Sequence, residues 1–89
     1  MMRGVVVTVS TTPTLLANGA SVGAQVSEVH LQNLSGVDIY VGGSDVATTT
    51  GLKVVSSDSI FGPIAIKAGA DLYGVVAAAT QPIRVLQSL

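Results

Sequence analysis

Hydrophobic and polar side chains alternate with a period near two along most of the chain, and turn residues interrupt the alternation about every ten residues. Because successive side chains of a strand point to opposite faces, this pattern predicts strands and no helix. The pattern favours a single all-β domain over residues 1–89, an antiparallel β-sandwich or small barrel of about seven to eight short strands. The expected strands are residues 4–10, 13–17, 26–33, 37–42, 52–56, 59–66, 71–77 and 82–87.

The third and fourth strands show the clearest alternation. In the third, Val29 and Leu31 share one face with Asn33, and the intervening polar residues take the other face. The segment LQNLSGVDIYV, residues 31–41, then predicts a hairpin whose turn centres on residues 34–36.

Two features mark the chain further along. Gly62 and Pro63 interrupt the sixth strand, which predicts an edge strand or two short pieces joined by a bend. The segment SGVDIYV at 35–41 is echoed by AGADLYG at 68–74. Each copy is interpreted as a Gly turn that leads into a strand, and a duplicated half of a Greek key is the alternative.

Composition supports strands and gives no sign of a polyanionic partner. Val and Ile together account for 20 residues, and aromatic residues for 3%. The net charge of -1 provides no electrostatic footprint for nucleic acid or an anionic membrane, so neither is an expected partner. Without Cys or clustered metal ligands, so short a chain is expected to gain stability from a partner surface or from oligomerisation.

The sequence predicts no signal peptide and no membrane-spanning segment. The apolar run in MMRGVVVTVS is shorter than a signal-peptide core, and the apolar run at 72–79 is too short to span a bilayer. We therefore expect a soluble protein synthesised in the cytosol.

Catalytic and ligand-binding motifs are weak. VGGSD at 41–45 is Gly-rich but precedes a polar loop instead of a helix, so Gly42 and Gly43 are expected to supply a bulge or a positive φ at a strand end. Asp45 is expected to organise the loop that follows. His30 has no companions at metal-ligand spacing, and no residues orient a Ser-His-Asp set. The expectation is a protein that is not an enzyme and holds no cofactor or metal.

The run LQNLSGVDIYVGGSDVATTTGLKV and the terminal DLYGVVAAATQPIRVLQ resemble small β-sandwich virion proteins of tailed bacteriophages. The resemblance covers residues 26–87, and TQP at 80–82 departs from the Gly-Thr turn that is more usual there. The matching residues are Asn33, Tyr40, Gly42, Gly43, Ser44, Asp45, Val46, Gly51, Leu72, Tyr73, Arg84, Val85 and Leu86.

This resemblance implies a capsid decoration or cement protein on the outer surface of the virion. Its expected partners are the major capsid protein and further copies of itself, as a homotrimer at local threefold positions. Residues 1–9 are expected to form the first strand or an N-terminal arm. The residues expected to contact the shell or another subunit are Val5, Val7, the exposed apolar residues Leu15 and Leu16, Phe61, Leu86 and Leu89.

A second function is left open by the two tyrosines. Tyr40 and Tyr73 are expected to point outward from their strands and could stack against a sugar. The alternative function is therefore a tail-tip, head-fibre or adhesin module that binds a host glycan.

Overall fold

The computed structural model describes residues 2–18, 26–56, 60–67 and 70–88, and these residues form eight strands and no helix. The predicted all-β fold is confirmed, with each strand bound within two residues of its expected position. The strands are β1 (Met2–Val9), β2 (Thr14–Asn18), β3 (Val26–Gln32), β4 (Ile39–Gly42), β5 (Leu52–Val54), β6 (Phe61–Lys67), β7 (Asp71–Val75) and β8 (Gln81–Ser88).

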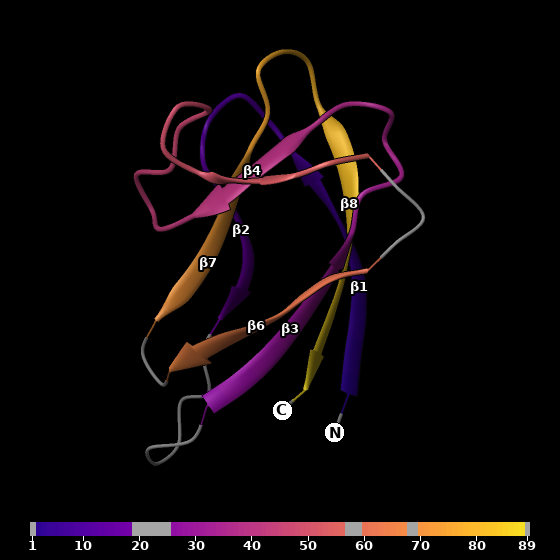
Figure 1. Ribbon diagram of the computed structural model, residues 1–89, viewed down its shortest axis with the longest axis vertical. Coiled ribbons are helices and arrows are strands. Elements are labelled where there is room, and N and C mark those ends of the chain that lie inside the picture. The colour runs from indigo at the N-terminus through magenta and orange to yellow at the C-terminus, as the bar shows by residue number, and fades with distance from the viewer. Residues whose placement is uncertain (1, 19–25, 57–59, 68–69, 89) are drawn as a thin grey trace.

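The described strands pair into two antiparallel four-stranded sheets, which pack as a β-sandwich (Figure 1). Sheet A has the order β1-β8-β3-β6, and sheet B has the order β2-β7-β4-β5. The first and last strands are neighbours, and their register runs without a break from Met2 opposite Ser88 to Val9 opposite Gln81. Both chain ends therefore lie at the same end of the sandwich (Figure 1).

The core lies between the sheets and consists of aliphatic side chains. Alternation along each strand directs one set of side chains inward, where β-branched residues pack well against a pleated surface. The most deeply buried large side chains come from both sheets and include Val9, Val29, Leu31, Ile39, Val41, Val54, Val76 and Ile83.

The predicted hairpin between the third and fourth strands is wrong. β3 lies in sheet A and β4 in sheet B, so the connection crosses from one sheet to the other. Its turn is where the sequence predicts it, with Gly36 at a φ of 90°. Alternation specifies the face that each side chain takes, but it does not specify which strand is the neighbour.

Asn33 holds this crossing together. Its Nδ2 donates to the carbonyl oxygens of Val37 at 2.7 Å and Val54 at 2.8 Å. Its Oδ1 accepts from the Ser35 backbone N–H at 3.0 Å and from the Ser35 hydroxyl at 2.6 Å. The amide is 1% exposed and uses both its donors and its acceptor, so it satisfies backbone groups that the crossing would otherwise leave unpaired.

The positive φ that was one expectation for Gly42 and Gly43 is not found. In the described part of the chain, the glycines with positive φ are Gly36 and Gly62. A Cβ atom at Gly42 would lie 3.1 Å from Cγ2 of Val46, and one at Gly51 would lie 2.8 Å from the same atom. Gly42 and Gly51 therefore make room for Val46, which is 6% exposed.

Backbone bonds hold the loop that follows β4. Val46 N–H donates to the carbonyl of Gly43 at 3.0 Å, and the N–H groups of Thr50 and Gly51 both donate to the carbonyl of Ala47. The Thr50 hydroxyl accepts from the Ala47 N–H at 3.1 Å. Thr50, and not Asp45, supplies the side chain in these bonds.

The sixth strand is an edge strand, as predicted. β6 pairs with β3 on one side, and the register shifts between Val29 and Leu31, close to Gly62 and Pro63. The two echoed segments contribute β4 and β7, which are neighbours in sheet B with Tyr40 opposite Val75 and Gly42 opposite Tyr73.

Candidate interaction surface

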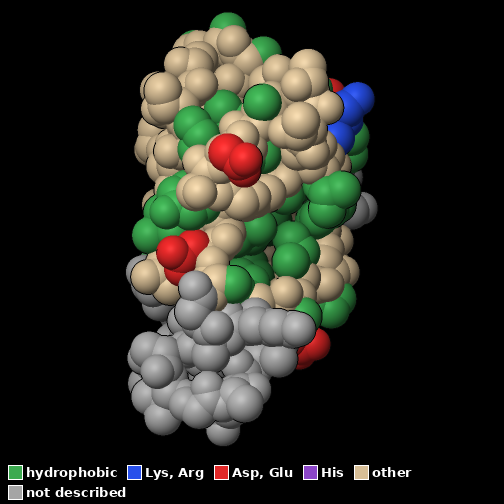
Figure 2. Space-filling view, turned by 90° about the vertical axis from the view of Figure 1, so that its left-hand side faces the viewer, with side chains coloured by type: hydrophobic (Ala, Val, Ile, Leu, Met, Phe, Trp, Pro, Cys, Tyr) green, Lys and Arg blue, Asp and Glu red, His purple; other side chains and the backbone are tan. Residues whose placement is uncertain are grey.

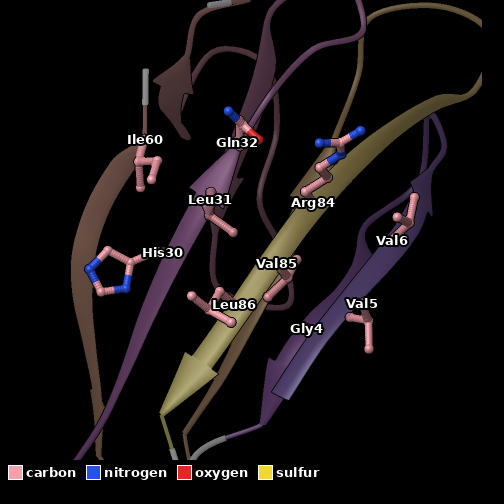
Figure 3. Close-up of a pocket in the computed structure, with 10 residues that line it drawn as sticks. All are labelled: Gly4, Val5, Val6, His30, Leu31, Gln32, Ile60, Arg84, Val85 and Leu86. Carbon is pink, nitrogen blue, oxygen red and sulfur yellow. The ribbon is translucent and has the colours of Figure 1, made fainter. Parts of the chain in front are cut away.

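The outer face of sheet A carries an apolar groove of about 590 Å³. It crosses three neighbouring strands, β1, β8 and β3, and reaches the residue before β6 (Figure 3). We call it the sheet A groove. Its lining residues are Gly4, Val5, Val6, His30, Leu31, Gln32, Ile60, Arg84, Val85 and Leu86.

One row of the groove runs through Gly4, Leu86 and His30, which the strand register places side by side. Leu86 is 40% exposed and points away from the core. His30 is half-buried, and its Nδ1 atom is buried without a hydrogen-bond partner in the described part of the chain. The ring therefore lies in the groove wall with one nitrogen that the described residues leave unsatisfied.

The next row runs through Val6, Arg84 and Gln32. Val6 is 65% exposed, and Ile60, at the far side of the groove, is 63% exposed. Among the described residues that line the groove, Arg84 is the one that carries a formal charge. The surface therefore combines exposed aliphatic side chains with a guanidinium that can bind a carboxylate or backbone carbonyls.

Four of the residues expected to make contacts lie in the sheet A groove, pack against the core, or do both. Leu86 lies in the groove. Val5, Val7 and Phe61 are partly buried and pack against the core, and Val5 also lines the sheet A groove.

The expected exposure of Leu16 is wrong, because Leu16 is buried, with 5% of its surface exposed, whereas Leu15 is 42% exposed. β2 shifts its register between Leu15 and Ala17, so Leu16 and Ala17 both face the core. Two consecutive leucines in a strand of a sandwich point to opposite faces, and one of them must pack inward. Leu89 lies outside the described residues.

Sequence reasoning missed Val6 and Ile60. The run Val5–Val7 hides the alternation, because each of its residues could face either way. Thr8 indicates the orientation of this run, because a polar residue is expected on the outer face. Val6 lies two positions before Thr8 and therefore shares that face. Ile60 precedes its strand and had no alternation to mark it.

A second surface lies on the outer face of sheet B. Tyr40 and Tyr73 are both half-buried there, and the strand register places them on the same face. Leu15 lies opposite Tyr73, and Lys53 lies opposite Tyr40. Lys53 Nζ is also 3.9 Å from Oδ2 of Asp38, an exposed ion pair of small energetic value.

Charged side chains do not gather into a site in the part of the chain that the structure describes. Figure 2 shows acidic side chains set apart from one another on a face with many hydrophobic side chains. Within the described ranges, no three His, Cys, Asp or Glu residues are placed to hold a metal ion together. These ranges also contain no helix of the length and apolarity that would cross a membrane.

Comparison of this chain with protein-family models, with curated proteins and with solved structures found no match. The basis for inferring a function is therefore the sandwich, the sheet A groove, and the resemblance of residues 26–87 to small virion proteins of tailed bacteriophages.

Proposed function

We propose that this protein is a non-enzymatic virion structural protein that binds the outer surface of a tailed-phage shell. The observation that carries the proposal is the sheet A groove, an exposed apolar surface on three adjacent strands. Exposed apolar surface of this kind is typical of protein interaction sites. The backbone of paired strands is fixed, so docking on this face orders little of the chain and costs little conformational entropy.

The resemblance gains support from what its residues do in the fold. Asn33 holds the crossing between the sheets, and Gly42 and Gly51 give space to Val46. Together, these residues build the crossing from β3 to β4 and the loop after β4.

The proposed mechanism is reinforcement of contacts between capsomers. The partner is the major capsid protein, which would place apolar side chains in the groove and a carboxylate or carbonyl group against Arg84. Many copies acting together raise the cost of rupturing the shell, because each bound copy stabilises the assembled form. The resemblance implies a homotrimer at local threefold positions.

Binding of the purified protein to empty mature shells tests the proposal. We expect a fixed number of copies per capsomer, and we expect Ile60→Lys to weaken binding by about tenfold or more, because a charge would be buried among apolar contacts. Leu52→Lys is the matched control, since Leu52 is 64% exposed but lies on β5 in sheet B. Binding to tail tubes and not to shells, or equal losses in the two variants, would contradict the proposal.

The tyrosines of sheet B favour a second candidate, a glycan-binding module. Tyr40 and Tyr73 lie on one outer face of neighbouring strands, where sugar rings could stack on them. In that case a glycan array gives binding that Tyr40→Ala and Tyr73→Ala each abolish, while Ile60→Lys leaves it intact. A blank array with the unmodified protein removes this candidate.

A further inference from the structure

The exposed edges of the two sheets differ in how they are protected. Among the described strands, β1 and β6 are the edges of sheet A, and β2 and β5 are the edges of sheet B. Exposed edges carry unpaired backbone groups that invite pairing with another chain, and proteins usually block them with prolines, bulges, charges or short strands.

Three of these described edges carry such a device. β6 contains Gly62 and Pro63 and an irregular register with β3. β2 shifts its register between Leu15 and Ala17. β5 has three residues, with the exposed Lys53 in its middle.

β1 carries none of these devices over residues 4–9, whose sequence is GVVVTV. Its eight residues pair with β8 in an unbroken register, so every second residue directs its N–H and C=O groups away from β8. Figure 1 shows β1 at the outer edge of the sheet, and Val6 on this strand is 65% exposed. A long, regular, valine-rich edge whose one charged residue, Arg3, lies near its start is the kind that accepts another strand.

We infer that β1 pairs antiparallel with β1 of a second copy about a twofold axis, which joins the two A sheets into one continuous sheet. This contact is isologous, since the same strand is used by both copies. The expected homotrimer would require contact between two different surfaces, and the other described edges are blocked. The β1 edge therefore replaces the threefold expectation with a twofold pair.

The sequence of β1 is compatible with such an axis. For the outer face of one copy to continue as the outer face of the other, residues that face each other must be of the same parity. A register centred on Val6 meets this condition, because it places Val6 opposite Val6 and Gly4 opposite Thr8. The same register places Arg3 opposite Val9, so no like charges meet across the pair.

Two features of the centred register favour a second copy of this chain, over an unrelated strand, as the occupant of the edge. The centred register brings together the two most exposed valines of β1 and sets a residue without a side chain beside Thr8. It also extends the sheet A groove across the axis, because Gly4, Val5 and Val6 line the groove in each copy.

Sedimentation equilibrium of the full chain, without shells, tests the pairing. We expect a reversible dimer with twice the 8.9 kDa mass of the chain. Val6→Lys is expected to weaken the dimer by about tenfold or more, because two ammonium groups would face each other at the axis. Leu52→Lys has nearly the same exposure at the start of β5 and is expected to leave the dimer intact.

Because the chain has no Cys, a cross-link provides a second measurement that does not depend on destabilising the fold. Val6→Cys is expected to form a disulfide-linked dimer on mild oxidation, since a centred register brings the two Cβ atoms close to disulfide distance. Leu52→Cys is the control and should stay monomeric on a denaturing gel. A monomer or trimer at all concentrations, or equal cross-linking in both variants, would overturn the inference whether or not the protein binds shells.

Discussion

Asn33→Ala is expected to lower the free energy of unfolding by about 3–5 kcal/mol, a large part of the stability of a domain this small. The substitution removes four hydrogen bonds that one amide makes in a site that is 1% exposed. It leaves the carbonyl of Val54 without the Nδ2 donor that it has in the buried crossing, and an unsatisfied buried group costs more than the average bond contributes. Urea unfolding followed by circular dichroism measures the change.

Ser35→Ala is the matched control for this prediction. The Ser35 hydroxyl bonds to Asn33 and to the carbonyl of Val37, but its backbone N–H still donates to Asn33 after the substitution. We expect a loss of about 1 kcal/mol. An Asn33→Ala protein as stable as Ser35→Ala would show that the amide does not hold the crossing between sheets.

Gly62→Ala is the second large effect, with an expected loss of about 3 kcal/mol or more. Gly62 has a φ of 123°, a conformation that residues with a side chain rarely adopt. A Cβ atom there would lie 2.8 Å from the carbonyl oxygen of Val29 and 3.2 Å from the backbone nitrogen of Ile64. Neither group can move without disturbing the pairing of β3 with β6.

Gly36→Ala separates these two causes. Gly36 also has a positive φ, of 90°, but a Cβ atom there would meet no other atom within 4 Å. Conformational strain alone then applies, and we expect a loss of about 1 kcal/mol. Thermal unfolding of the two variants side by side measures the difference, and equal losses would mean that the close approach to Val29 has no energetic weight.

The strands were predictable because alternation is a local property. Each strand reports its own inward and outward residues, and β-branched residues reinforce that signal. Pairing was less predictable, since the segment from Leu31 to Val41 has the turn of a hairpin and the topology of a crossing between sheets. The crossing depends on the bond from Asn33 to Val54, a residue 21 positions away, and no local pattern encodes it.

The candidate surface was predictable only in part. Leu86 was expected from its place near the chain end, and it lies in the sheet A groove. Val6 belongs to a run of valines whose orientation depends on the register with β8. Leu15 and Leu16 point to opposite faces of β2, and the pairing with β7, not the leucine pair itself, determines which of the two faces the core.

A reconstruction of the virus particle that carries this chain tests the central claim most directly. The account predicts density for the β-sandwich on the outside of the shell, with Val6, Ile60 and Leu86 of sheet A facing the capsid protein. Density for the sandwich at the tail, or on the shell with the outer face of sheet B as its contact, would contradict it.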